Sequence, residues 1–263
     1  MDAAGAADPV PKTGGRPAIH DRREIVDAIA YWLRAGCAWR LLPHDFPPWQ
    51  TVYHYWRVWR IEGRWERIVT ELRRRERRRQ GRNPAPSAGV MDSQSVKATE
   101  RGGLHGYDGA KKLSGVKRHL LVDTLGLVLV ACVGPANVDD RDAAMVLLSR
   151  ACRRVRRLRH VFADQGYRGA EFADWIRQVL GISVEIVVRR DGGLRRSRVP
   201  TGSPPREVPR IAVVSRRWVV ERTFAWLGRH RRLSKDYEYL ISTSENVIYA
   251  ATVFLLVHRL AGT

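Results

Sequence analysis

Three acidic residues stand at the ends of three unlike segments in a chain that is otherwise strongly basic. Asp92 follows the apolar pair Val90–Met91, Asp164 closes the apolar run Val161–Ala163, and Glu221 lies in an arginine-rich segment. Three converging carboxylates can hold two Mg²⁺ ions, because magnesium prefers oxygen ligands and keeps several of its waters. Two such ions can activate a nucleophile and stabilise the leaving oxygen of a phosphodiester displacement. The acids therefore predict chemistry on nucleic acid.

The charge of the chain supports a nucleic-acid partner. Lysine and arginine together number 47 against 27 acidic residues, which gives a formal net charge of +20. Such an excess predicts a polyanionic partner, most simply double-stranded DNA. Codon bias in a GC-rich genome is the alternative, and it explains the choice of arginine over lysine but not the shortage of acids. Apolar residues make up 44% of the chain, which excludes global disorder.

Cysteine usage and hydropathy indicate the compartment. The three cysteines form no Cys-x-x-Cys pair, so we expect neither a zinc knuckle nor a disulfide framework. Residues 1–20 contain no apolar stretch of the kind found in a signal peptide, and the run Ala250–Val257 is too short to span a bilayer. We therefore expect a cytoplasmic protein with no membrane partner.

The first third of the chain reads as a helical module. Residues 1–20 are rich in Ala, Gly and Pro and are expected to form a disordered tail. Helices are expected from Asp21, from about Thr51 and after Gly63, each with an apolar stripe. We interpret residues 21–82 as a DNA-binding domain of helix-turn-helix type that ends in a basic linker. A purely structural cap is the alternative reading.

The remainder, residues 87–263, predicts an α/β catalytic domain that begins after the boundary at Pro84 to Pro86. Its expected element order is β-β-β-α-β-α-β-loop-α-α, which matches a ribonuclease-H-like core with a mixed five-stranded sheet. The first strand would be central and parallel to the fourth. Asp92 and Asp164 would then share one end of the sheet, and the helix that carries Glu221 would lean across it. The five expected strands cover residues 90–96, 118–123, 127–133, 160–164 and 184–188, and the helices cover 140–153, 170–180, 215–228 and 245–260.

Six motifs carry a resemblance to a known family. The chain is similar to the catalytic domain of bacterial DDE transposases, and the nearest group is the insertion sequence five family. The similarity runs from about residue 16 to the C-terminus. The motifs are Met91–Lys97, Gly106–Lys112, Lys117–Gly126, Ala136–Asp142, Ala163–Gly169 and Arg216–Leu227.

The resemblance implies a ribonuclease-H-like core that cleaves and transfers transposon ends with two Mg²⁺ ions, for which Mn²⁺ can substitute. It also implies a homo-oligomer on transposon ends and target DNA, associated with the bacterial nucleoid. By position, Asp92, Asp164 and Glu221 are the catalytic and metal-binding acids.

The family signature around the third acid, Tyr-x2-Arg-x3-Glu-x6-Lys, is only partly matched. Arg217 fits the Arg, whereas Val214 replaces the Tyr and Gly228 replaces the Lys, with Arg229 next. Which cation grips the terminal phosphate is therefore left open.

Basic residues near the acids are the candidates for contact with DNA. One group surrounds the first acid in sequence: Lys97, Lys111, Lys112, Lys117, Arg118 and His119. A second group accompanies the Glu221 helix: Arg217, Arg229, Arg231, Arg232 and Lys235. A solvated loop and a solvated helix end are the alternatives. Asp123, Asp140 and Asp142 are expected to be turn or cap residues rather than metal ligands.

Three hypotheses about function follow. The first is a transposase that binds terminal inverted repeats, cuts their 3′ ends and joins them to target DNA. The second is a DNA-binding repressor derived from a transposase, against which the presence of all three acids argues. The third is a ribonuclease-H-like nuclease that cuts without joining.

Overall fold

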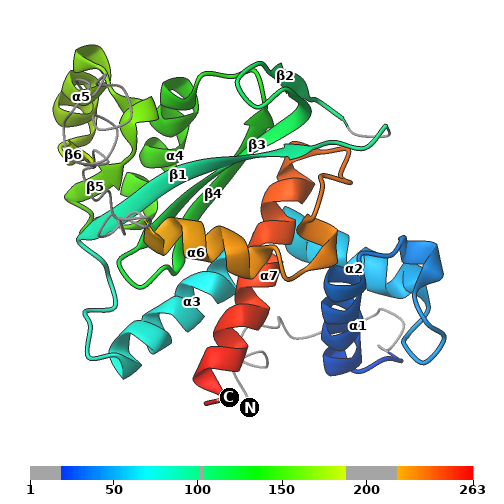
Figure 1. The fold of residues 1–263 in the computed structure, drawn as a ribbon. Coiled ribbons are helices and arrows are strands. Elements are labelled where there is room, and N and C mark those ends of the chain that lie inside the picture. Colours follow the sequence, from blue (N-terminus) through cyan, green and yellow to red (C-terminus); the bar gives the residue numbers. More distant parts are fainter. Residues whose placement is uncertain (1–18, 101–102, 188–217, 263) are drawn as a thin grey trace, which may run out of the picture.

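The N-terminal region is helical, as predicted. The structure is a computed structural model that describes residues 19–100, 103–187 and 218–262 (Figure 1). Asp21 caps the first helix by accepting a 2.8 Å hydrogen bond from the Arg23 N–H, and Gly36 ends it with a φ of 70°. Residues 1–18 of the expected disordered tail lie outside the described residues. The helices are α1 (Arg22–Ala35), the 3-10 turn η2 (Trp39–Leu41), α2 (Trp49–Ile61) and α3 (Arg64–Arg79).

Tryptophans hold these helices together. Trp32, Trp56 and Trp65 are almost completely buried, and the Trp32 ring stacks on Trp39 with 4.1 Å between centroids. Large aromatic rings bury much apolar surface and fix the angles between short helices. Most of the basic run at residues 73–82 forms the last turns of α3. A helix-turn-helix arrangement of α1 to α3 remains a prediction.

The sheet has the predicted mixed topology. Strand β1 pairs with β3 in antiparallel and with β5 in parallel orientation, β5 pairs with β6 in parallel, and β4 pairs with β3 in antiparallel orientation. All five expected strands are present. A sixth strand, the short β2, lies between the first two expected strands and pairs with β3. The strands are β1 (Ala88–Lys97), β2 (Gly106–Asp108), β3 (Leu113–Asp123), β4 (Val128–Pro135), β5 (His160–Ala163) and β6 (Ser183–Ile186).

Helices cover both faces of the sheet (Figure 1). One hydrophobic core includes side chains of α4 and the α5 region, and the other includes side chains of α3, α6 and α7. The expected helix at residues 170–180 is α-helical only in its first half and continues as a π-helical turn, η4. The first three residues of the expected helix at 215–228, and the expected loop before it, lie outside the described residues. These elements are α4 (Asp140–Arg154), η3 (Gln165–Tyr167), α5 (Ala170–Trp175), η4 (Ile176–Leu180), α6 (Trp218–Leu227), η5 (Arg231–Leu233) and α7 (Ile241–Leu260).

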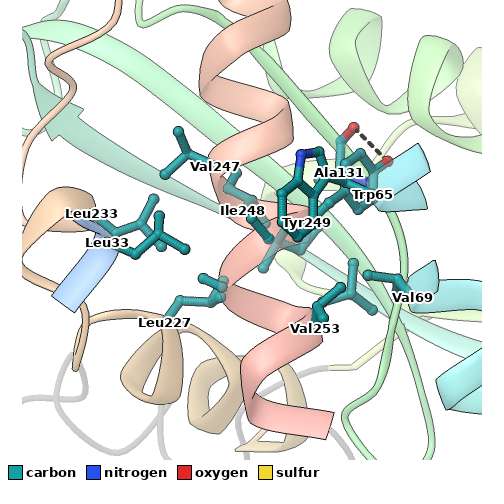
Figure 2. Close-up of a cluster of buried hydrophobic side chains, with 14 of the residues drawn as sticks. Leu33, Trp65, Val69, Ala131, Leu227, Leu233, Val247, Ile248, Tyr249 and Val253 are labelled. Atoms are coloured by element: carbon teal, nitrogen blue, oxygen red, sulfur yellow. Dashed lines mark hydrogen bonds between the residues drawn. The ribbon is translucent and has the colours of Figure 1, made fainter. Parts of the chain in front are cut away.

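Helix α7 lies at the centre of the larger core (Figure 2). Ile248 and Ala250 are fully buried, and the Tyr249 hydroxyl accepts a 2.9 Å hydrogen bond from the Ala131 N–H of β4. The same cluster takes in Leu33 from α1 and Trp65 from α3, so its side chains come from both sides of the expected boundary at Pro84 to Pro86. The boundary itself remains a prediction. Among the helices of the described segments, none combines the length and apolar character that a membrane crossing requires.

Candidate active site

Asp92 lies in the middle of β1, and Asp164 directly follows the carboxyl end of the neighbouring parallel strand β5. The pairing of β1 with β5 runs from Ala88 opposite His160 to Val90 opposite Phe162. Each aspartate stands two residues beyond the last of these pairs, and Asp164 keeps an extended backbone. Side chains alternate along a strand, so Asp92 leaves the sheet on the same face as Val90. The carboxyl ends of parallel strands are where ligands collect in α/β sheets.

A third aspartate, Asp140, lies beside this pair. Asp140 begins α4, and its Oδ1 accepts hydrogen bonds from Lys117 Nζ at 3.1 Å and Ser93 Oγ at 3.2 Å. A Cβ atom added to Gly166 would lie 3.1 Å from Asp164 Oδ1 and 3.9 Å from Asp140 Oδ2. The carboxylates of Asp164 and Asp140 therefore both lie next to Gly166. Asp140 was expected to be a turn or cap residue, but the structure makes it part of a polar cluster.

Tyr167 is the buried centre of that cluster. Burial raises the pKa of Tyr167 well above its ordinary value, and the negative charges of Asp140, Asp92 and Asp164 add to the rise, whereas a hydrogen bond with Ser93 opposes it. Only 2% of Tyr167 is exposed. A neutral hydroxyl among three carboxylates can donate a hydrogen bond without adding charge. The one signal for this residue in the sequence was its place in the motif Ala163–Gly169.

Glu221 faces the same strand from α6. It lines an open hollow with residues of α6 and with Ser93 and Gln94, which follow Asp92 on β1; Lys111 lines it from the turn between β2 and β3. The remaining lining residues are Phe224, Ala225 and Gly228. Glu221 and these three residues recur at helical spacing, so one face of α6 forms a wall of the hollow.

Two hydrogen bonds fix α6 against the sheet. Thr223 Oγ1 lies 2.8 Å from the carbonyl oxygen of Gly126, and Arg222 Nη2 donates to the carbonyl of Leu125 at 3.0 Å. Both carbonyls belong to the turn between β3 and β4. Gly126 has a φ of +81°, and an added Cβ there would lie 3.0 Å from Thr223 Oγ1. Glycine is therefore needed both for the turn and for the close approach of α6.

The donor set suits Mg²⁺ in its chemistry, but the three predicted acids do not form one ligand group. Across the described residues, no cluster of three His, Cys, Asp or Glu side chains is close enough to hold a metal ion. Asp92 offers carboxylate oxygens from β1, and Asp164 offers them from the segment that directly follows β5. Mg²⁺ is commonly held by one or two carboxylates together with substrate phosphates and water. Asp92 and Asp164 both lie close enough to Tyr167 to raise its pKa, whereas Glu221 lies on the facing helix α6.

The basic candidates divide by exposure. Six are exposed and lie on the surface around the sheet end and α6: Lys97, Lys111, Lys112, Arg229, Arg231 and Lys235. Lys117 is half-buried and bound to Asp140. Arg217 lies outside the described residues.

Arg118 and His119 lie in the interior, in contrast to the DNA-facing positions expected for them. Arg118 is 4% exposed and donates to the carbonyls of Leu233 and Lys235 at 2.6 and 3.0 Å. Burial lowers the pKa of Arg118 to about 10 and that of His119 to about 4. A buried neutral imidazole offers no charge to a phosphate. We therefore leave both residues out of the proposed DNA-contact surface.

Arg232 is also engaged within the protein. Its guanidinium binds Glu238 at 2.7 Å, lies over the Trp32 ring at 4.6 Å and donates to the Cys37 carbonyl at 3.3 Å. This clasp joins the segment after α6 to α1. Next to it, an added Cβ on Gly36 would lie 3.0 Å from the Arg231 Cβ. Arg232 thus ties the N-terminal helices to the segment that follows Glu221.

A mixed sheet of this order, with helices on both faces, is typical of the ribonuclease-H-like class. Comparison with family models is more specific. The model described as "Transposase DDE domain" matches residues 83–256, and the chain therefore belongs to the DDE transposase family. A second model, described as "Putative transposase of IS4/5 family", matches residues 6–69. No curated protein matches the chain. The predicted family is confirmed.

Proposed function

We propose that this protein is a transposase that binds the terminal inverted repeats of an insertion sequence, cuts their 3′ ends and joins them to target DNA. The proposal is supported by the parallel pairing of β1, which carries Asp92, with β5, which Asp164 follows, within a segment that matches the DDE transposase domain. Glu221 is the third acid, presented from α6 across the hollow that borders the strand after Asp92.

In the proposed site, Asp92 and Asp164 would hold Mg²⁺, with Mn²⁺ as a substitute, and Glu221 would complete the set when DNA is bound. The metal would supply nucleophile activation and charge neutralisation at the phosphate. Lys111, on the far side of the hollow from Glu221, places a cation where the DNA backbone enters. Lys117 neutralises Asp140 through a 3.1 Å ion pair, which limits repulsion between Asp140 and the neighbouring acids.

The N-terminal helices supply the proposed recognition of repeat ends. Gln50, Tyr53, His54 and Arg57 recur at helical spacing on α2, and all four are exposed. Side chains of these types can hydrogen-bond to base edges in a major groove. The tryptophans behind this face are buried in the core and so position α2. We assign α2 as the element that reads the repeat, in an arrangement of helix-turn-helix type.

The basic surface and the family suggest the partners and setting. The six exposed cations near the hollow are proposed to contact transposon-end or target DNA, and Arg217 is proposed to join them. Transposon ends must be paired before they are joined, so we propose a homo-oligomer on DNA in the bacterial cytoplasm, at the nucleoid.

An assay with labelled repeat ends and Mg²⁺ tests the proposal against its two rivals. Joined products support a transposase. Nicked ends without joining would instead favour a ribonuclease-H-like nuclease, and binding without any cut would favour a repressor. Omitting the divalent ion is the control, because cleavage that persists in a chelator would remove the metal from the proposal.

A further inference from the structure

A basic hollow lies at the amino end of β1, at some distance from the catalytic acids along the same strand. It is bounded by the end of α3, the segment that leads into β1, the turn between β3 and β4, and the loop before β5. No carboxylate lines it. The lining residues are Arg77, Arg82, Asn83, Pro86, Ser87, Ala88, Thr124 and Arg157.

Two of its three arginines are available to a ligand. Arg77 is already occupied, because it pairs with buried Asp123 and donates to the Asn83 carbonyl at 2.7 Å. Arg82 is exposed, and its side chain makes no hydrogen bond or ion pair with the described residues. Arg157 is exposed and donates one N–H to the Ala85 carbonyl at 2.9 Å, which leaves most of its five donors unused.

The chemistry of the hollow suits an oxyanion. Guanidinium groups bind phosphate oxygens through paired N–H donors, and the Ser87 and Thr124 hydroxyls add neutral donors beside them. The acid behind the hollow, Asp123, is fully buried and neutralised by Arg77, so it does not repel an anion at the surface.

We propose that this hollow binds backbone phosphates of the transposon-end duplex, as a second DNA contact apart from the catalytic acids. This inference rests on the proposed function. Ala88 in the hollow and Asp92 are four residues apart on β1, which is about 13 Å at roughly 3.3 Å per residue. Successive phosphates on one strand advance about 3.4 Å along the duplex. A duplex that crosses the surface in the direction of β1, outside the helices that cover the sheet, would therefore reach Arg82 and Arg157 about four base pairs from the site of cleavage.

The test compares full-length Arg82→Ala and Arg82→Ala/Arg157→Ala with wild type in binding a 30-base-pair repeat-end duplex at increasing salt. The slope of log K against log salt is negative, and loss of one phosphate contact reduces its magnitude by about 0.9. We therefore expect the magnitude to fall by about 0.9 in the single variant and by about 1.8 in the double variant. The control, Arg75→Ala/Arg177→Ala, removes the same charge from arginines already paired with Glu71 and Asp174. Its slope should stay near that of wild type.

Two further measurements separate a phosphate contact from a structural role. At saturating DNA we expect an unchanged kcat with a raised KM for the double variant. Neutral methylphosphonates placed three to five nucleotides from the cut should weaken wild-type binding and have little effect on the double variant. A slope equal to that of wild type overturns the inference, and so does a fall in kcat with KM unchanged. If the variants lose affinity only for inorganic phosphate, the hollow is an anion site that DNA does not use.

Failure of the inference is distinguishable from failure of the proposed function. The salt measurement needs binding alone, so it decides the inference even if no cleavage occurs. A wild type that cuts and joins ends, with variants that bind as it does, overturns the inference only. A wild type that binds no duplex overturns both.

Discussion

The Thr223 hydroxyl lies 2.8 Å from the Gly126 carbonyl, and this contact joins the helix of the proposed third acid to the tip of the β3–β4 hairpin. Thr223 is fully buried and stands two residues after Glu221. Helix α6 also packs against β1 and α7, and this contact ties the middle of the helix to the hairpin tip. The position of Glu221 therefore depends on a turn far away in sequence.

Replacement of Thr223 by Val should slow DNA cleavage more than it weakens DNA binding. Valine keeps the shape but leaves a buried carbonyl unpaired, which costs about 1–3 kcal/mol. A shift of α6 then misplaces Glu221. Single-turnover cleavage at saturating DNA measures the effect. Thr223→Ser, which keeps the hydroxyl, is the matched control and should retain most of the rate. A Val variant as fast as wild type would mean that this contact does not position Glu221.

Neutralising any proposed catalytic acid should abolish cleavage and spare DNA affinity. Asp92→Asn, Asp164→Asn and Glu221→Gln each preserve size while removing the charge that metal binding needs. Strand cleavage and equilibrium binding to the same duplex measure the two effects separately. Asp142→Asn, an exposed acid in the first turn of α4, is the control and should cut normally. Any of the three variants that retains cleavage identifies a residue outside the site.

Removing Asp123 should destabilise the whole fold. Asp123 is fully buried, pairs with Arg77 and accepts 2.9 Å hydrogen bonds from the Leu125 and Leu127 N–H groups. Asp123→Ala leaves a buried arginine without its partner, which costs about 3–5 kcal/mol of unfolding free energy. Urea denaturation measures the change.

The exposed ion pair between Arg75 and Glu71, 3.4 Å apart, is the reference for that measurement. Arg75→Ala should change the unfolding free energy by less than about 1 kcal/mol. If Asp123→Ala and Arg75→Ala changed the unfolding free energy equally, the buried pair would contribute no more to stability than the exposed pair.

His119 should make the fold less stable in mild acid. Burial lowers its pKa from 6.5 to about 4, so between these values the unfolded chain takes up a proton that the folded chain does not. The unfolding free energy therefore falls as pH drops from 6.5 to 4, by on the order of 3 kcal/mol in total. His119→Leu should remove this component, seen as a smaller difference in unfolding free energy between pH 6.5 and 4.5.

Other groups also titrate in this range, so the comparison is between variants rather than between pH values. His44→Leu, at an exposed position, is the control and should leave the acid-induced loss unchanged. A His119→Leu protein with the full wild-type loss would contradict the assignment.

The sequence predicted the five main strands and their mixed order because these depend on local patterns. Apolar runs fixed the strands, and the parallel pairing of the first with the fourth followed from the connections between them. The burial of Arg118 and His119 was not predictable in that way. Their polar run resembles a surface strand, but β3 lies between β1 and β4 with helices over both faces, so even its charged residues are buried.

Asp140 was missed for a related reason. At the start of a helix an aspartate usually acts as a cap, and its partners Lys117 and Ser93 come from strands that only the folded sheet brings near. Its place inside a family motif was the one signal available in the sequence. Glu221 was predicted from the same kind of motif, but its distance from the other acids depends on how α6 is seated on the hairpin.

The clasp of Arg232 on Trp32 and Cys37 has a consequence for engineering. A chimera that takes its first helices from a relative, in order to test whether these helices choose the DNA ends as proposed, would have to import both halves of this contact. A mismatched graft would leave the guanidinium of Arg232 without its aromatic partner and would loosen the seat of the glutamate helix. Exchange of the N-terminal helices therefore has to preserve their contacts with the segment that follows α6, as well as any base recognition.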